Sequence, residues 1–193
     1  MADVKYTITF FSEWHTGSGL TSGSDLDALV LKDKDGLPFI PGKTLKGLLK
    51  GAAIDINEIK GVNSAQDDFI TEVFGFFDEE KKLQSEVHTK GKAYFTDAGL
   101  SAGLKAEILD HKNTLIPFLF RSMASTAIDE SGVAKKRSLR KMETCIPLCL
   151  EANIMFLDDA YIERMEECMQ WIKRMGLSRH RGLGRCKFEI IKE

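Results

Sequence analysis

Residues 37–50, which read LPFIPGKTLKGLLK, decide the fold of this 193-residue chain. The first four residues are apolar and follow a turn, as an extended strand does. Pro41 and Gly42 interrupt that strand, and leucines then recur at 45, 48 and 49 with helical spacing. The stretch therefore predicts a strand that passes directly into an amphipathic helix, ending near Ile54, with its apolar face on a sheet.

The residues before this stretch predict two more strands. Residues 4–11 alternate between apolar and polar and are rich in β-forming types, so they predict a first strand. Residues 16–24 are small and polar and predict a loop. Residues 26–31 predict a short strand, which the Asp35-Gly36 turn joins to residues 37–40 as a hairpin.

The residues after it predict an α+β domain. We expect a short helix over 69–77, a loop over 81–92, strands over 93–98, 115–120, 145–157 and 185–192, and a helix over about 160–175 capped by Asp158-Asp159. This order fits a ferredoxin-like (RRM-like) sandwich with its helices on one face of an antiparallel sheet. We therefore predict a single domain over 1–193, with an insert at about 55–115 and a projecting hairpin at about 121–143.

The composition is that of a globular protein and argues against a membrane protein. Hydrophobic residues make up 43% and charged residues 29% of the chain, and no apolar stretch approaches the 18 residues of a membrane span. The N-terminus does not resemble a signal peptide. The four cysteines form no CxxC pair, which favours reduced thiols over a zinc site. We expect a cytoplasmic protein.

The charge is small in total but unevenly distributed. The formal net charge is −2, which alone argues mildly against nucleic-acid binding. Two segments, 121–141 and 173–187, nevertheless gather most of their charge as lysine and arginine, and the second contains no acidic residue. A surface of this kind can bind a phosphate backbone despite a near-neutral total, and the alternative is that both segments are merely solvated.

Three local patterns suit contacts with RNA. Gly176, Gly182 and Gly184 permit a close approach of the backbone to phosphate. Lys43 and Thr44 lie where the helix begins, which is either an anion site or an ordinary helix start. Met123 and Ile128, placed near the tip of the predicted hairpin, would act as a wedge between bases, or the hairpin would instead contact a neighbouring subunit.

Several segments, in the same order along the chain, resemble the RAMP superfamily, which builds the backbones of type III CRISPR effectors. Residues 37–50 resemble its proline- and glycine-containing strand-to-helix stretch, and Val73-Phe74-Gly75 resembles the "LFG" that follows. Residues 93–98 resemble its strand ending in "DA", residues 128–143 its thumb hairpin, and residues 176–185 its C-terminal glycine-rich loop. The single-domain length resembles the repeated backbone subunit.

The resemblance implies an RNA-binding subunit in antiviral CRISPR defence. Its implied partners are a CRISPR guide RNA, target RNA, copies of itself and other effector subunits, with no membrane. The expected RNA-binding residues are Lys43, Thr44, Lys46, Lys50, Met123, Ile128, Lys135, Lys136, Arg137, Arg140, Arg179, His180, Arg181, Gly182, Gly184 and Arg185.

The resemblance also implies a metal-dependent endoribonuclease that cuts guide-paired target RNA. The family's catalytic aspartate aligns with Asp27, and Asp25 is the alternative; Asp27 would hold Mg²⁺ or another divalent metal, or orient the ribose 2′-hydroxyl. The chain departs from the family after Asp27, where Ala28-Leu29-Val30 stand in place of Ser-Pro. The alternatives are a non-catalytic RNA-binding scaffold, a guide-RNA-processing endoribonuclease with His15 as general base, and an unrelated ferredoxin-like domain.

Overall fold

The computed structural model describes residues 2–21, 26–77 and 88–191. A four-stranded antiparallel sheet forms the centre, with its strands in the spatial order β4-β7-β1-β8. These are Tyr94–Phe95, Cys149–Leu157, Ala2–Phe10 and Cys186–Ile190. Along the chain, helix α1 lies between β1 and β4, and helix α4 lies between β7 and β8. This is the ferredoxin-like arrangement that the sequence predicts.

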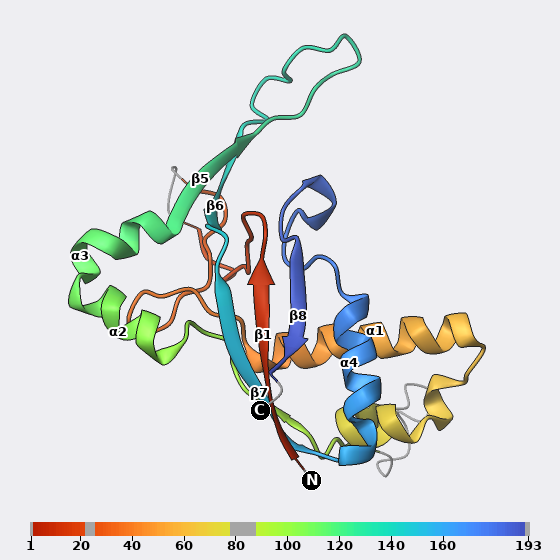
Figure 1. Cartoon of the computed structure of the whole chain (residues 1–193). Coiled ribbons are helices and arrows are strands. Elements are labelled where there is room, and N and C mark those ends of the chain that lie inside the picture. The colour runs from red at the N-terminus through yellow and green to blue at the C-terminus, as the bar shows by residue number, and fades with distance from the viewer. Residues whose placement is uncertain (1, 22–25, 78–87, 192–193) are drawn as a thin grey trace.

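The two long helices cover one face of the sheet (Figure 1). Helix α1, Gly42–Lys60, buries leucines 45 and 49, alanines 52 and 53, and Ile56 against inward side chains such as Tyr6, Ile8 and Ile154. Helix α4, Ile162–Trp171, buries Met165, Cys168 and Met169 in the same core. Apolar burial on this face is the main stabilising term of the domain.

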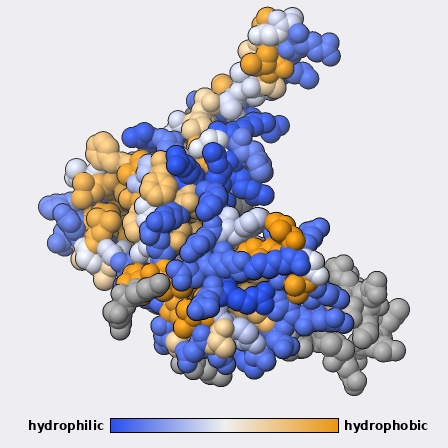
Figure 2. Space-filling view, turned by 45° about the vertical axis from the view of Figure 1, so that its right-hand side comes forward, coloured by the Kyte–Doolittle hydropathy of each residue, from blue (hydrophilic) through white to orange (hydrophobic). Residues whose placement is uncertain are grey.

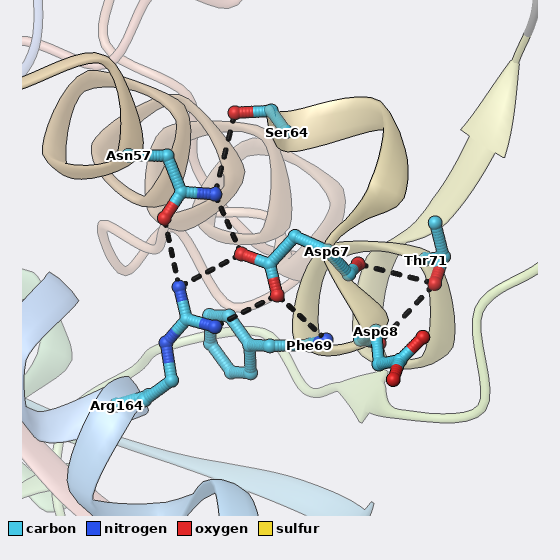
Figure 3. A network of polar contacts seen from close by, with 7 residues as sticks. All are labelled: Asn57, Ser64, Asp67, Asp68, Phe69, Thr71 and Arg164. Carbon is cyan, nitrogen blue, oxygen red and sulfur yellow. Dashed lines mark hydrogen bonds and ion pairs between the residues drawn. The ribbon is translucent and has the colours of Figure 1, made fainter. Parts of the chain in front are cut away.

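The segment between α1 and β4 packs against the helices through a charged cluster. It contains the turns η1 (Ser64–Gln66) and η2 (Ile70–Phe74) and the strands β2 (Gly75–Phe77) and β3 (His88–Lys90). Figure 3 shows Asp67 of this segment between Asn57 of α1 and Arg164 of α4. Arg164 binds both carboxylate oxygens of Asp67, at 2.7 and 2.8 Å, and lies over the Phe69 ring.

A second, smaller cluster carries the projecting hairpin. Helix α2 (Ala102–Asp110), helix α3 (Lys112–Leu115) and the turn η3 (Ile116–Leu119) enclose Leu37, Ile108 and Leu119. Strands β5 (Phe120–Ser125) and β6 (Arg140–Cys145) then leave the body as a two-stranded ribbon (Figure 1). The short turns η4 (Asp159–Tyr161) and η5 (Arg179–Arg181) complete the described elements.

Several predicted elements are wrong in extent or type. Helix α1 continues to Lys60, past the predicted end near Ile54, and ends where Gly61 adopts a left-handed conformation. The strand predicted at 115–120 is helical up to Leu119, because Pro117 stands at the start of a 3₁₀ turn and the leucines face the small cluster. The expected insert at 55–115 is interrupted by β4, which belongs to the central sheet.

The strands predicted at 26–31 and 145–157 are also shorter than expected. Residues 26–31 form only isolated bridges, although the turn at 33–36 does bring Lys32 opposite Pro38. The strand predicted over 145–157 is broken at Pro147, which has no N–H to donate. Cys145 is consequently buried at the end of β6, and Cys149 is exposed at the start of β7. In the described part of the chain, no helix combines the length and hydrophobicity of a membrane span.

Candidate nucleic-acid interface

The hairpin is a regular ribbon with an irregular basic arm beyond it. Strands β5 and β6 pair from Phe120 opposite Cys145 to Ser125 opposite Arg140. The arm, residues 126–139, is held by its own side chains: Ser138 Oγ accepts from the Ala127 N–H at 3.1 Å, and Asp129 Oδ1 accepts from the Ser131 and Val133 N–H groups. Local hydrogen bonds therefore shape an arm that lies outside both hydrophobic clusters.

The two side chains expected to form a wedge lie at different heights along the hairpin. Ile128 is 68% exposed beside the tip, as expected, and pairs with Ala134 across it. Met123 lies within the ribbon, opposite Met142, rather than near the tip. The predicted place of Met123 near the tip was wrong, because Met123 already belongs to β5, before the arm that begins at residue 126. Of the two, only Ile128 has the exposed place near the tip that the sequence predicts.

The structure brings the two basic segments together at one groove. Lys135, Lys136, Arg137 and Arg140 of the hairpin line a hollow of about 420 Å³, and Arg181 of the glycine-rich loop lines it with them. The other lining residues are Ser125, Thr126, Ala127 and Ser138, so no acidic side chain lines it. Figure 2 shows hydrophilic residues over the base of the hairpin. Cations and hydroxyls without acids suit a phosphate backbone.

Two of the three glycines in the glycine-rich loop are needed for packing within the protein, not for the approach to phosphate that the sequence suggests. A Cβ on Gly184 would collide with the Met175 carbonyl, and one on Gly176 would collide with the His15 carbonyl. These two glycines are therefore required by packing within the protein. Gly182, with φ +93° and open space around it, is the one of the three that leaves the backbone open to a ligand. Arg179, His180 and Arg181 stand exposed on η5 directly before it.

Arg185 lies at the end of the loop and contacts two residues that follow β1, Ser12 and Phe11. Its N–H donates to Ser12 Oγ at 2.9 Å, and its guanidinium lies 5.8 Å from the centre of the exposed Phe11 ring. The loop is also tied to the segment after β1, because the Leu177 N–H donates to the His15 carbonyl at 2.9 Å. The loop, the end of β1 and the hairpin base thus form one end of the molecule (Figure 1).

Asp27 lies at the base of the hairpin. Its carboxylate Oδ2 accepts from the Lys141 N–H at 2.8 Å, and its own N–H donates to the Lys141 carbonyl at 2.8 Å. Its side chain is exposed to solvent. The alternative residue, Asp25, lies outside the described residues. The Asp27 carboxylate is therefore held against Lys141 of β6, whose neighbour Arg140 lines the basic groove.

Glu143 links the same regions and was not singled out from the sequence. Its carboxylate accepts from the Val30 N–H at 3.0 Å and from Lys32 Nζ at 2.7 Å, and its N–H donates to the Ala28 carbonyl. Its carbonyl accepts from His15 Nδ1 at 2.6 Å. His15 is 1% exposed, which places it inside the protein rather than at an RNA-facing surface. No linear pattern marks Glu143, since its partners come from distant segments.

The start of α1 forms a second basic region. Lys43 and Thr44 line a groove of about 680 Å³ together with residues 16–18. Lys46 is half-buried, and its pKa is lowered first by burial and then by the neighbouring charges of Lys50 and Lys90. Lys50 differs from the other two lysines, because its Nζ donates to the Gly75 carbonyl at 2.7 Å. Lys50 is thus anchored in the protein, and within the described residues no such bond holds Lys43 or Lys46.

Comparison with known proteins places this geometry in a family. The model of the RAMP superfamily matches residues 7–187. The chain belongs to the RAMP superfamily. The projecting hairpin and the glycine-rich loop both fall within the matched residues.

Two solved structures show the same fold over their full length. A chain of the type III-B Cmr-beta bound to cognate target RNA, determined by cryo-EM, aligns with a TM-score of 0.71 and 14% identity, covering 98% of this chain and 97% of that one. A chain of the apo state of the type III-B Cmr-beta aligns with a TM-score of 0.67 and 13% identity, covering 99% and 98%. Among curated proteins, no sequence matches this RAMP chain.

The residues present offer a metal only part of its coordination. Within the described ranges, no group of three or more His, Cys, Asp or Glu side chains is arranged to hold an ion. Mg²⁺, however, is commonly bound by one or two carboxylates, with water and substrate phosphates as its other ligands. Asp27 fits that mode, since it supplies one exposed carboxylate near a basic groove.

Proposed function

We propose that this RAMP protein is an RNA-binding backbone subunit of a type III CRISPR effector complex. The observation that carries the proposal is the basic groove in which Arg181 meets the four hairpin cations. Family membership and the full-length likeness to chains of type III-B structures, one of them bound to target RNA, support it. The ligands are a guide RNA and target RNA, and the partners are further copies of the chain and other effector subunits.

We further propose that the subunit cuts target RNA beside the hairpin and that Asp27 carries the reaction. Asp27 is attached to Lys141 through both its backbone and its carboxylate, so it keeps a fixed place relative to the RNA-binding arm. Its second carboxylate oxygen would hold Mg²⁺ together with RNA phosphate. The 2′-hydroxyl of the ribose would lose its proton and attack the adjacent phosphorus, forming a 2′,3′-cyclic phosphate while the bond to the 5′-oxygen breaks and that oxygen leaves protonated. A metal bound there would supply positive charge that stabilises the negative charge developing on the phosphate.

A non-catalytic scaffold is the second candidate, and one contact favours it. The hydrogen bond from the Lys141 N–H gives the Asp27 carboxylate a structural task that needs no chemistry. Guide processing with His15 as the base is less favoured, because that imidazole is enclosed and bonded to the Glu143 carbonyl. The experiment must therefore separate the charge of Asp27 from its hydrogen bond.

Asp27→Asn makes this separation in the reconstituted complex with guide RNA. The amide oxygen can still accept from Lys141, but the charge that would hold a cation is lost. If Asp27 is catalytic, cleavage in Mg²⁺ falls by about 100-fold or more, as expected for several kcal/mol of lost metal assistance, and guide binding stays unchanged. Chelation of the metal should stop the wild-type reaction. Asp110→Asn, at the exposed end of α2, is the matched control.

Two outcomes would contradict parts of the proposal. Equal cleavage by Asp27→Asn and wild type would remove the catalytic assignment, and guide binding without any cleavage would favour the scaffold. Failure of the wild-type chain to bind single-stranded RNA at low salt would contradict the RNA-binding function itself.

A further inference from the structure

A second groove lies along the β4 edge of the sheet, away from the hairpin. It has a volume of about 380 Å³ and is lined by the first turns of α1, by residues 90–95 and by Phe156 of β7. Lys43, Lys46 and Lys90 line it, and in the described part of the chain none of the three is paired with a carboxylate. Lys92 also lines it but is bound to Glu72 at 2.9 Å. Among the residues that the structure describes, the groove therefore carries three lysines without a paired carboxylate.

Phe156 is held in this groove in an unfavourable conformation. Its φ is +61°, a left-handed value that a bulky residue rarely adopts, and such strain persists mainly where the surrounding structure or a function requires it. Its N–H donates to Asp3 Oδ1 at 3.3 Å, which fixes the bend. The ring is nevertheless 53% exposed, so burial does not account for a phenylalanine at this position.

A second exposed ring lines the same groove. Tyr94, on the edge strand β4, pairs with Met155, the neighbour of Phe156, and is 59% exposed. Aromatic faces beside unpaired cations are the combination that binds single-stranded nucleic acid, because bases stack on the rings and phosphates pair with the lysines. An acidic ligand without bases would need the cations but not the rings.

We propose that Phe156, Tyr94, Lys43, Lys46 and Lys90 form a subsite for one stretch of single-stranded RNA, with a base stacked on Phe156. The inference rests on the proposed RNA-binding function and extends it to a place that the hairpin and the glycine-rich loop do not reach. Lys43, Tyr94 and Phe95 also line the groove that runs to residues 16–18, next to His15 and the glycine-rich loop. The subsite thus continues a path that begins at the basic end of the molecule.

Phe156→Gly tests the subsite without endangering the fold. Glycine adopts φ +61° without strain, so thermal stability should be kept or raised, while the stacking face is lost. We expect the affinity of the full-length chain for a fluorescent single-stranded polyuridine RNA to fall about fivefold or more. Phe156→Trp should restore it, because the indole supplies a larger face. Phe118→Ala, which removes a still more exposed ring on η3, should have no effect.

The hairpin variant Lys135→Ala/Lys136→Ala, measured alongside, separates the two proposals. If it loses affinity while Phe156→Gly binds like wild type, the subsite is wrong and the RNA-binding function stands. If the wild-type chain does not bind the RNA, both fall. A Phe156→Gly chain that binds RNA normally but no longer associates with other copies would assign the groove to a protein contact and overturn the inference.

Discussion

At the scale of single residues, Asp67 is the carboxylate that joins three segments. Burial alone would oppose its ionisation, but hydrogen bonds from Arg164 and Asn57 outweigh burial and lower its pKa. The ion pair therefore contributes stability above the unfolded pKa of about 3.9 and loses it as the pH falls through the lower folded value. The network in Figure 3 should thus stabilise the protein at neutral pH and weaken only in acid.

We predict that Asp67→Asn lowers the free energy of unfolding by about 3 kcal/mol at pH 7. This is the lower end of the range for breaking a buried pair, because the Arg164 side chain is 34% exposed. Urea unfolding at neutral and acidic pH measures it, and the difference from wild type should shrink as Asp67 becomes protonated. Asp68→Asn, exposed and adjacent, should change stability by less than about 0.5 kcal/mol. Equal effects of the two variants would contradict the assignment.

Single residues also show where sequence reasoning reaches its limit. The lysines and arginines of the interface were predictable, because charge on a loop or an arm is exposed wherever the arm lies. Glu143 and the reason for Gly184 were not, since both depend on backbone that lies far away in sequence. Phe156 was hidden for the same reason: the strand pattern of β7 does not reveal a residue with positive φ.

At the scale of elements, periodicity predicted type better than extent. The leucine spacing identified α1, but the apolar pattern continues to Ile56, so the helix outlasts the predicted end. An apolar run at 115–120 is equally compatible with a strand and a helix. Pro117, at the start of the 3₁₀ turn η3, favours the helical form. The polar, basic stretch at 121–143 was identified as a hairpin because its turn residues stand between two extended runs.

The hairpin arm should be separable from the fold. Replacing residues 126–139 by Asn-Gly would join Ser125 to Arg140, which already face each other across the ribbon. We predict an unchanged melting temperature, because the arm contributes to neither hydrophobic cluster, and at least about a tenfold loss of affinity for guide RNA, because three of the groove's five cations are removed. Thermal denaturation and fluorescence anisotropy measure the two quantities. A large drop in melting temperature would show that the arm supports the body.

At the scale of the whole molecule, the proposed function depends on the distribution of charge more than on the net charge. The net charge of −2 gives little reason to expect RNA binding. The fold collects the hairpin cations and Arg181 at one end, while β1 begins and β8 ends toward the other (Figure 1). Acidic side chains lie elsewhere: Glu167 of α4, for example, pairs with Lys60 of α1. A sequence shows the two basic segments, but only the topology shows that they share one groove.

This separation of charge predicts how salt acts on binding. Each phosphate contact to single-stranded RNA contributes about 0.7 to the slope of log affinity against log salt, so removing two contacts should reduce the slope by about 1.4. We expect Lys135→Ala/Lys136→Ala to show this reduction in anisotropy titrations over a range of salt concentrations. Lys60→Ala removes a lysine from the far end of α1 and should leave the slope unchanged. A hairpin variant with weaker binding but an unchanged slope would mean that these lysines shape the arm rather than contact phosphate, since only lost ion pairs alter the number of cations released from the RNA.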